Sequence, residues 1–211
     1  MKIGVINYGV GNLGSVCGAL DVLGANYISL SNATEIGQVD ALILPGVGGF
    51  TECKKLLDEG GWTELIQVAV VSEKKPLLGI CLGMQLLASF GKEGADSVAD
   101  TPGLGLIPGC VTSLKALGVN QRIPHVGWNS ILVQTEIGLL KGIPSGTDFY
   151  FVHSYGFIAD NPNHVLAVVD YDVKIPVVIK HENVWGTQFH PEKSSRAGFK
   201  MLKNFMANYT C

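Results

Sequence analysis

The sequence lacks the features that mark secreted, zinc-binding, membrane-spanning and nucleic-acid-binding proteins. Its five cysteines are scattered without a C-x-x-C pair, which argues against a zinc site and a disulfide framework. No basic cluster occurs, and 15 Lys and Arg against 18 Asp and Glu give a formal net charge of −3, which gives no hint of nucleic acid. The longest mostly apolar run, Leu77 to Ala88, is too short to cross a bilayer. We therefore expect a cytoplasmic protein with no membrane segment and no metal.

The length and composition of the chain are sufficient for one large hydrophobic core. The 211 residues are 47% hydrophobic and only 16% charged. No repeat, low-complexity tract or Pro/Ser linker divides the chain. We therefore predict a single domain spanning residues 1–211.

The two halves of the chain differ in their pattern of apolar residues. In the first half, apolar strand-like runs alternate with helical periodicity, which predicts a doubly wound, mainly parallel α/β sheet. The second half predicts a meander or mixed sheet, and so an additional smaller β-sheet, before helical periodicity returns at the C-terminus. The predicted strands are 2–7, 27–30, 39–44, 76–80, 110–114, 122–126, 130–134, 148–153, 165–170, 176–180 and 184–189, the helices are 13–23, 50–58, 62–73, 82–87 and 195–207, and 91–105 is a loop.

Cys81 stands between a predicted strand and a predicted helix, with Gly79 and Gly83 on either side. A Gly-x-nucleophile-x-Gly pattern at such a junction indicates a nucleophile elbow, because small flanking residues permit a tight turn that exposes the side chain. The start of the helix favours a thiolate over a thiol. Cys81 is therefore the candidate nucleophile, in preference to a buried structural cysteine.

A second glycine pattern carries less information. Gly9-x-Gly11-x-x-Gly14 matches the dinucleotide-binding fingerprint, but the second predicted strand ends in Ser31-Asn32 instead of the required acidic residue. A tight turn facing a partner is the preferred interpretation.

A cysteine nucleophile needs a base, and the base needs an orienting group. His190 ends an apolar run, and Glu192 follows two residues later, so both side chains would face the same side of an extended strand. The other histidines have simpler interpretations: His164 and His181 as solvated turn residues, and His125 and His153 as core or interface packing.

Three segments together resemble the signature motifs of the class I (triad) glutamine amidotransferases. They are Pro45-Gly-Val-Gly48, Gly79-Ile-Cys-Leu-Gly-Met-Gln85 and Gln188-Phe-His-Pro-Glu-Lys-Ser194, in the family's order and spacing. The resemblance covers essentially the entire chain. It implies a flavodoxin-like α/β fold and an enzyme that hydrolyses L-glutamine to glutamate and ammonia without a cofactor.

The resemblance also implies roles for individual residues. Cys81 forms a γ-glutamyl thioester, His190 moves the protons and Glu192 orients the imidazole. The backbone of Leu82 and of the Gly46–Gly48 turn would hold the oxyanion. The full set implied to bind substrate is Gly46, Val47, Gly48, Leu82, Gln85, Glu93, Ser154 and Tyr155.

Further segments are similar to the glutaminase subunits of imidazole glycerol phosphate synthases. These are Tyr8-Gly-Val-Gly-Asn-Leu13, Pro124-His-Val-Gly-Trp-Asn129 and Tyr150-Phe-Val-His-Ser-Tyr155. The similarity implies a heterodimer with a (β/α)₈-barrel cyclase subunit that uses the ammonia in histidine synthesis. The positions that match the subunit interface are Asn12, Trp128, Tyr150 and Lys193.

Two departures from the family pattern keep an alternative open. Gly91-Lys-Glu-Gly94 stands where the family has Ser-Glu-Glu-Gly, which leaves Glu93 to recognise the α-amino group, and Gly49 adds flexibility at the oxyanion turn. A paralogous branch supplies ammonia for amidine formation on a surface-polysaccharide sugar. A cysteine peptidase on a similar elbow and a non-catalytic binding module are rival hypotheses.

Since the amidotransferase pattern occupies all 211 residues, we expect the ammonia acceptor to bind on a partner chain.

Overall fold

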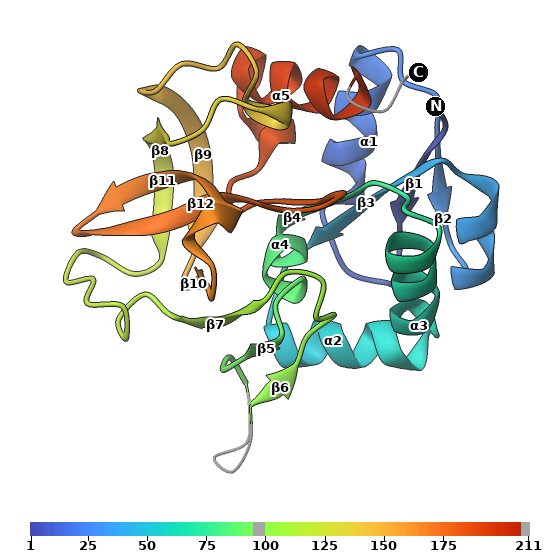
Figure 1. The fold of residues 1–211 in the computed structure, drawn as a ribbon, viewed down its shortest axis with the longest axis horizontal. Coiled ribbons are helices and arrows are strands. Elements are labelled where there is room, and N and C mark those ends of the chain that lie inside the picture. Colours follow the sequence, from blue (N-terminus) through green and yellow to red (C-terminus); the bar gives the residue numbers. More distant parts are fainter. Residues whose placement is uncertain (95–99, 208–211) are drawn as a thin grey trace.

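The computed structural model describes residues 1–94 and 100–207 (Figure 1). Part of the predicted 91–105 loop and the cysteine at 211 lie outside the described residues. The helices are α1 (Leu13–Val22), α2 (Phe50–Glu59), α3 (Trp62–Gln67), α4 (Leu82–Leu86) and α5 (Ser195–Ala207). The strands are β1 (Ile3–Ile6), β2 (Tyr27–Leu30), β3 (Ala41–Gly46), β4 (Leu77–Cys81), β5 (Phe90–Gly91), β6 (Thr101–Pro102), β7 (Gly109–Ser113), β8 (His125–Val133), β9 (Thr147–His153), β10 (Tyr155–Ala159), β11 (Val165–Tyr171), β12 (Val173–His181) and β13 (Val184–Thr187).

The main sheet has the strand order β2-β1-β3-β4-β13-β12-β11-β8-β9. Its pairs are parallel from β2 to β13 and antiparallel from β13 to β9. A second, four-stranded sheet has the order β10-β7-β5-β6. These sheets confirm the predicted α/β class and the additional smaller sheet.

Helices cover the parallel strands on both faces. In β3, Ala41 and Ile43 join the core beneath α1 and α5, whereas Leu42 and Leu44 join the core beneath α2, α3 and α4. Successive strand residues point to opposite faces, so a strand buried on both sides requires an unbroken apolar run. Figure 1 shows α1 and α5 on one side of the sheet and α2 and α3 on the other. The small sheet packs on the α2 side, through residues such as Val111 and Phe157.

Several predicted boundaries in the second half are wrong. The predicted strands 122–126 and 130–134 form the single strand β8, which continues through Gly127 at a positive φ of 129°. The predicted loop 91–105 contains the short strand β6 and the second residue of β5, Gly91, both in the small sheet. Strand β10 was not predicted, because the aromatic run that forms β9 continues past Ser154, and no cluster of turn residues marks the change of sheet.

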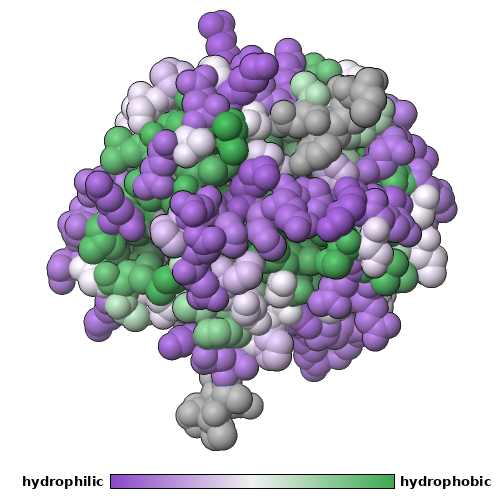
Figure 2. All heavy atoms as spheres, viewed as in Figure 1, coloured by the Kyte–Doolittle hydropathy of each residue, from purple (hydrophilic) through white to green (hydrophobic). Residues whose placement is uncertain are grey.

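The surface is mixed in character. On the face drawn in Figure 2, hydrophilic residues occupy much of the centre and hydrophobic residues form smaller groups around them. Within residues 1–94 and 100–207, no helix is both long and apolar enough to cross a membrane. The same residues contain no group of three or more His, Cys, Asp or Glu side chains arranged to hold a metal ion.

Candidate active site

Cys81 is the last residue of β4 and adopts a strained backbone conformation, with φ 56° and ψ −112°. A non-glycine residue with a positive φ is uncommon and clusters at functional sites. The flanking glycines serve close packing, since a Cβ on Gly83 would lie 1.9 Å from the carbonyl oxygen of Leu44. A Cβ on Gly79 would lie 2.6 Å from the carbonyl oxygen of Gly83. The glycine pattern predicts that Gly79 and Gly83 permit the turn itself, but Cys81 carries the positive φ, and the glycines let α4 approach β3 and β4.

Three neighbouring parallel strands end at the same edge of the sheet. Gly46 of β3 is in register with Cys81, and Thr187 of β13 is in register with Ile80, one residue before Cys81. The turn 46–48 at the end of β3, the candidate nucleophile at the end of β4 and the candidate base after β13 therefore meet at one place. The carboxyl edge of a parallel sheet is where α/β proteins bind ligands.

His190 and Glu192 are in contact. Nδ1 of His190 lies 2.7 Å from Oε1 of Glu192, and both side chains are almost fully buried. The sequence argument for this contact was wrong in its geometry: β13 ends at Thr187, and Pro191–Lys193 forms a 3₁₀ turn that brings Glu192 back to the ring. Because a carboxylate can only accept, Nδ1 carries the hydrogen and Nε2 of the neutral ring is free to accept a proton.

Burial alone would lower the pKa of His190, but interactions with Cys81 and Glu192 outweigh it and raise the pKa to about 9. Nε2 has no hydrogen-bond partner among the described residues. The sulfur of Cys81 instead lies 3.8 Å from the carbonyl oxygen of Val152. The 2.7 Å contact with Glu192 is therefore the firmest support for the upward direction of the pKa.

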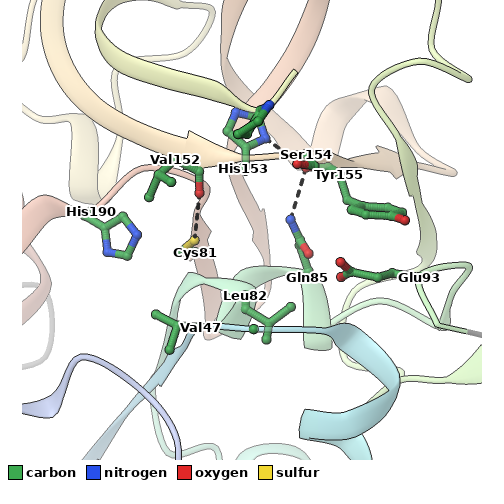
Figure 3. A pocket seen from close by; sticks show the side chains of 12 residues that line it. Val47, Cys81, Leu82, Gln85, Glu93, Val152, His153, Ser154, Tyr155 and His190 are labelled. Carbon is green, nitrogen blue, oxygen red and sulfur yellow. Dashed lines mark hydrogen bonds between the residues drawn. The ribbon is translucent and has the colours of Figure 1, made fainter. Parts of the chain in front are cut away.

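A cavity of about 370 Å³ opens beside Cys81 (Figure 3). It is lined by Val47, Gly48, Cys81, Leu82, Gln85, Glu93, Pro124, Val152, His153, Ser154, Tyr155 and His190. Figure 3 shows His190, Cys81, Gln85 and Glu93 in that order across the cavity, with the imidazole turned toward the sulfur. A nucleophile and a base stand at one end, and an amide and a carboxylate stand at the other.

The lining includes every predicted substrate-binding residue except Gly46, together with Cys81 and His190. Gly46 ends β3 beside the cavity, where a Cβ would lie 2.8 Å from the backbone nitrogen of Gly83. Glu192 lies behind His190, out of the lining. Sequence reasoning missed Pro124, Val152 and His153 as lining residues, although all three fall in the quoted motifs 124–129 and 150–155.

Gln85 is buried and its amide orientation is determined by its neighbours. Nε2 donates to the carbonyl oxygen of Tyr155 at 3.1 Å and to Oε1 of Gln188 at 3.0 Å. Both amide hydrogens are therefore used, and Oε1 of Gln85 remains as an acceptor beside Glu93 (Figure 3).

Glu93 accepts a hydrogen bond from the backbone N–H of Phe50 at 3.0 Å, and its backbone oxygen accepts one from the hydroxyl of Thr51. Burial raises the pKa of Glu93, and the Phe50 N–H partly opposes this shift. Two acceptors, the carboxylate of Glu93 and the carbonyl of Gln85, thus face the same end of the cavity. Such a pair suits a ligand group that only donates, such as an ammonium.

Two buried histidines lie in contact beside the cavity, and one of them, His153, lines it. Nδ1 of His153 lies 2.8 Å from the carbonyl oxygen of Tyr155, and Nε2 lies 3.0 Å from Nδ1 of His125. His125 is stacked between the rings of Phe151 and Tyr171. Burial lowers the pKa of each to about 4, so both rings are neutral near pH 7. His125 fits its predicted packing role, whereas His153 also lines the cavity.

The four predicted interface residues lie on elements that adjoin one another. Trp128 on β8 and Tyr150 on β9 are cross-strand partners whose rings meet edge to face, with centroids 6.1 Å apart. Lys193 is exposed on the 3₁₀ turn, which contacts both β9 and α1, and Asn12 caps the start of α1. Val126 and Val152 are also cross-strand partners, and both are exposed.

Comparison with known proteins identifies the family. The family model for glutamine amidotransferase class-I matches residues 5–209. The chain is 45% identical to proteins named imidazole glycerol phosphate synthase subunit HisH from Bacillus cereus and Bacillus anthracis, over 96% of this chain and 93% of each relative. Among solved structures, one described as a glutamine amidotransferase has a TM-score of 0.75 at 22% identity and covers 97% of both chains. PurLQS from Thermotoga maritima has a TM-score of 0.74 at 18% identity and covers 99% of both chains. This chain belongs to the class-I glutamine amidotransferase family.

Proposed function

We propose that this chain is the glutamine-hydrolysing subunit of an imidazole glycerol phosphate synthase. The observation that carries the proposal is the order of groups along the cavity, with His190 and Cys81 at one end and Gln85 and Glu93 at the other (Figure 3). Glutamine has a reactive amide at one end and an ammonium at the other, so it matches this order.

In the proposed reaction, His190 accepts the thiol proton at Nε2 and the sulfur of Cys81 attacks the side-chain amide carbon of glutamine. As the tetrahedral intermediate collapses, the C–N bond breaks, the nitrogen takes a proton from His190 and ammonia leaves. Water, deprotonated by His190, then cleaves the thioester to glutamate and the free thiol. Glu192 holds the ring in place and stabilises its positive charge in the steps where Nε2 carries a proton.

The developing oxyanion needs donors next to the sulfur. We assign this role to the N–H of Leu82 and to an N–H of the turn 46–48, each worth about 3–4 kcal/mol in the transition state. Cys53 donates to the carbonyl oxygen of Val47 at 3.4 Å, so its thiol helps set the orientation of the Val47–Gly48 peptide. Val47 and Gly48 are exposed, and we infer that a docked partner completes this turn.

The exposed face of β8 and β9 is the proposed docking site for the cyclase subunit. The apolar residues Val126 and Trp128 are 55% and 56% exposed there, and Tyr150 and Val152 lie opposite them. Val152 also lines the cavity, and its carbonyl oxygen is the one beside the Cys81 sulfur. A partner on this face would therefore stand close to where ammonia is released.

The relatives favour the histidine pathway over amidine formation on a polysaccharide sugar, because those reported above are named as imidazole glycerol phosphate synthase subunits. The test is glutamate production from glutamine, with peptide substrates as the comparison, measured with and without an imidazole glycerol phosphate synthase cyclase subunit. Glutamate release that needs Cys81 supports the proposal, whereas peptide cleavage without glutamine hydrolysis would refute it.

A further inference from the structure

Gln188 is a buried polar residue between the nucleophile and the residue proposed to recognise glutamine. It follows the end of β13 and is 0% exposed. Its backbone N–H donates to the carbonyl oxygen of Val177 at 2.9 Å, which fixes the chain there. A fully buried amide side chain is costly unless it is hydrogen-bonded, so its partners indicate its role.

The direction of the hydrogen bonds around Gln188 follows from one group that can act only as an acceptor. The carbonyl oxygen of Tyr155 can only accept, so the edge of Gln85 that faces it must be the NH₂. The second hydrogen of that NH₂ is donated to Oε1 of Gln188 at 3.0 Å. Nε2 of Gln188 is then left to face the sulfur of Cys81, 3.9 Å away.

We propose that Gln188 is a positioning residue that couples glutamine recognition to the reactivity of Cys81, an inference that rests on the proposed glutaminase function. Its oxygen holds the Gln85 amide so that Oε1 of Gln85 faces the substrate ammonium. Its NH₂ presents a donor to the sulfur, and a donor favours the negatively charged form of its partner. One side chain thus acts on both ends of the cavity.

Two substitutions separate these contacts. Gln188→Glu keeps an acceptor for Gln85 but replaces the donor near the sulfur with an acceptor. Gln188→Met removes both contacts at similar volume. Gln67→Glu and Gln67→Met are matched controls, because Gln67 is an exposed glutamine whose amide donates a hydrogen bond to the carbonyl oxygen of Leu104, away from the cavity.

The experiment measures labelling of the Cys81 peptide by iodoacetamide in the full chain, across pH, by mass spectrometry. Thiolates react and thiols do not, so the pH midpoint of labelling reports ionisation without any need for turnover. The glutamine concentration that half-protects Cys81 reports binding in the same samples.

We expect Q188E to move the labelling midpoint upward by about one pH unit and to leave half-protection within about threefold of wild type. Q188M should move the midpoint upward and raise the half-protecting concentration by about tenfold. If Q188E does not fold, Q188N provides the same labelling test, because its shorter side chain withdraws the amide from the sulfur.

Unchanged midpoints in these variants would overturn the inference, as would equal loss of protection in Q188E and Q188M. Failure of the proposed function has a different signature: glutamine would not protect Cys81 in the wild-type chain either. Unchanged midpoints in the Gln67 controls support a specific role for Gln188, and shifts equal to those of the Gln188 variants refute it.

Discussion

The parallel and antiparallel parts of the main sheet differ in burial, and the difference separates chemistry from docking. Strands β1, β3, β4 and β13 are buried along their whole length, whereas β8 and β9 alternate buried and exposed residues. The nucleophile and base follow the buried strands, which helices fix from both sides. The half-exposed pair instead presents Trp128 and Val126 to solvent. Substitutions in the first part should therefore affect turnover, and those in the second should affect association.

The largest expected loss of glutamine hydrolysis follows substitution of Cys81 at the end of β4. Cys81→Ala should reduce glutamine hydrolysis by at least about 10⁴-fold, because no other group can form the thioester. Synthesis by the proposed complex from free ammonia should continue, since we place the acceptor site on the partner. Retained glutaminase activity, measured as glutamate release, would remove Cys81 from its role.

A smaller loss of glutaminase activity is expected when Glu192, which contacts the proposed base His190, is replaced. Glu192→Gln keeps a side chain of the same shape but loses the charge that orients and stabilises the imidazolium, so kcat should fall by about 10²–10⁴-fold. The matched control is Glu182→Gln, which alters an exposed pair with Lys74. Equal activity in the two variants would contradict the assigned role.

Glu192→Gln should also change how the free energy of unfolding depends on pH. His190 has a pKa of about 9 in the fold and an ordinary value of 6.5, so its proton stabilises the fold fully below pH 6.5 and less as pH rises toward 9. Glu192→Gln should flatten this decline in denaturant unfolding measured between pH 6.5 and 9. A decline as steep as in the wild-type chain would show that Glu192 does not hold the proton.

On the antiparallel part, the expected effect falls on partner binding. Trp128→Ala should weaken binding of the cyclase subunit by about 2–4 kcal/mol, as for an aromatic residue at the centre of an interface. Val126→Ala should weaken binding more than Val71→Ala, because the two valines are similarly exposed, at 55% and 56%, and only Val126 lies on the docking face. Calorimetry of the complex measures both, and equal affinities for all three variants would move the interface elsewhere.

The smallest effect concerns the buried histidine pair. His125 and His153 have a pKa of about 4 in the fold against an ordinary 6.5, so the unfolded chain binds more protons between these values. Stability should therefore fall as pH drops from 6.5 to 4. His125→Phe, with His181→Gln as control, should reduce this slope. An unchanged slope would mean that other groups control acid unfolding.

The sequence predicted the parallel part of the sheet better than the rest. Strands buried on both faces are continuous apolar runs, so β1 and β4 were predicted to within one residue of their observed bounds. The edge strand β2 is only partly buried and was predicted at its observed bounds. The second half was predicted less well, because β8 and β9 are half-exposed and the chain changes sheet at Ser154 without a cluster of turn residues. The motifs placed Cys81, His190 and most lining residues, but not the register that puts β13 beside β4. The proposed role of Gln188 was not predicted for a related reason, because its side chain reaches Cys81 and Gln85 only when β13 lies beside β4.

The central claim is that this chain hydrolyses glutamine for a partner that docks on β8 and β9. Its most direct test is the rate of glutamate release by the purified chain, alone and after addition of an imidazole glycerol phosphate synthase cyclase subunit with its nucleotide ligand. We expect slow release by the chain alone and a large increase on addition of both. Full activity of the isolated chain, or no increase with the partner present, would contradict it.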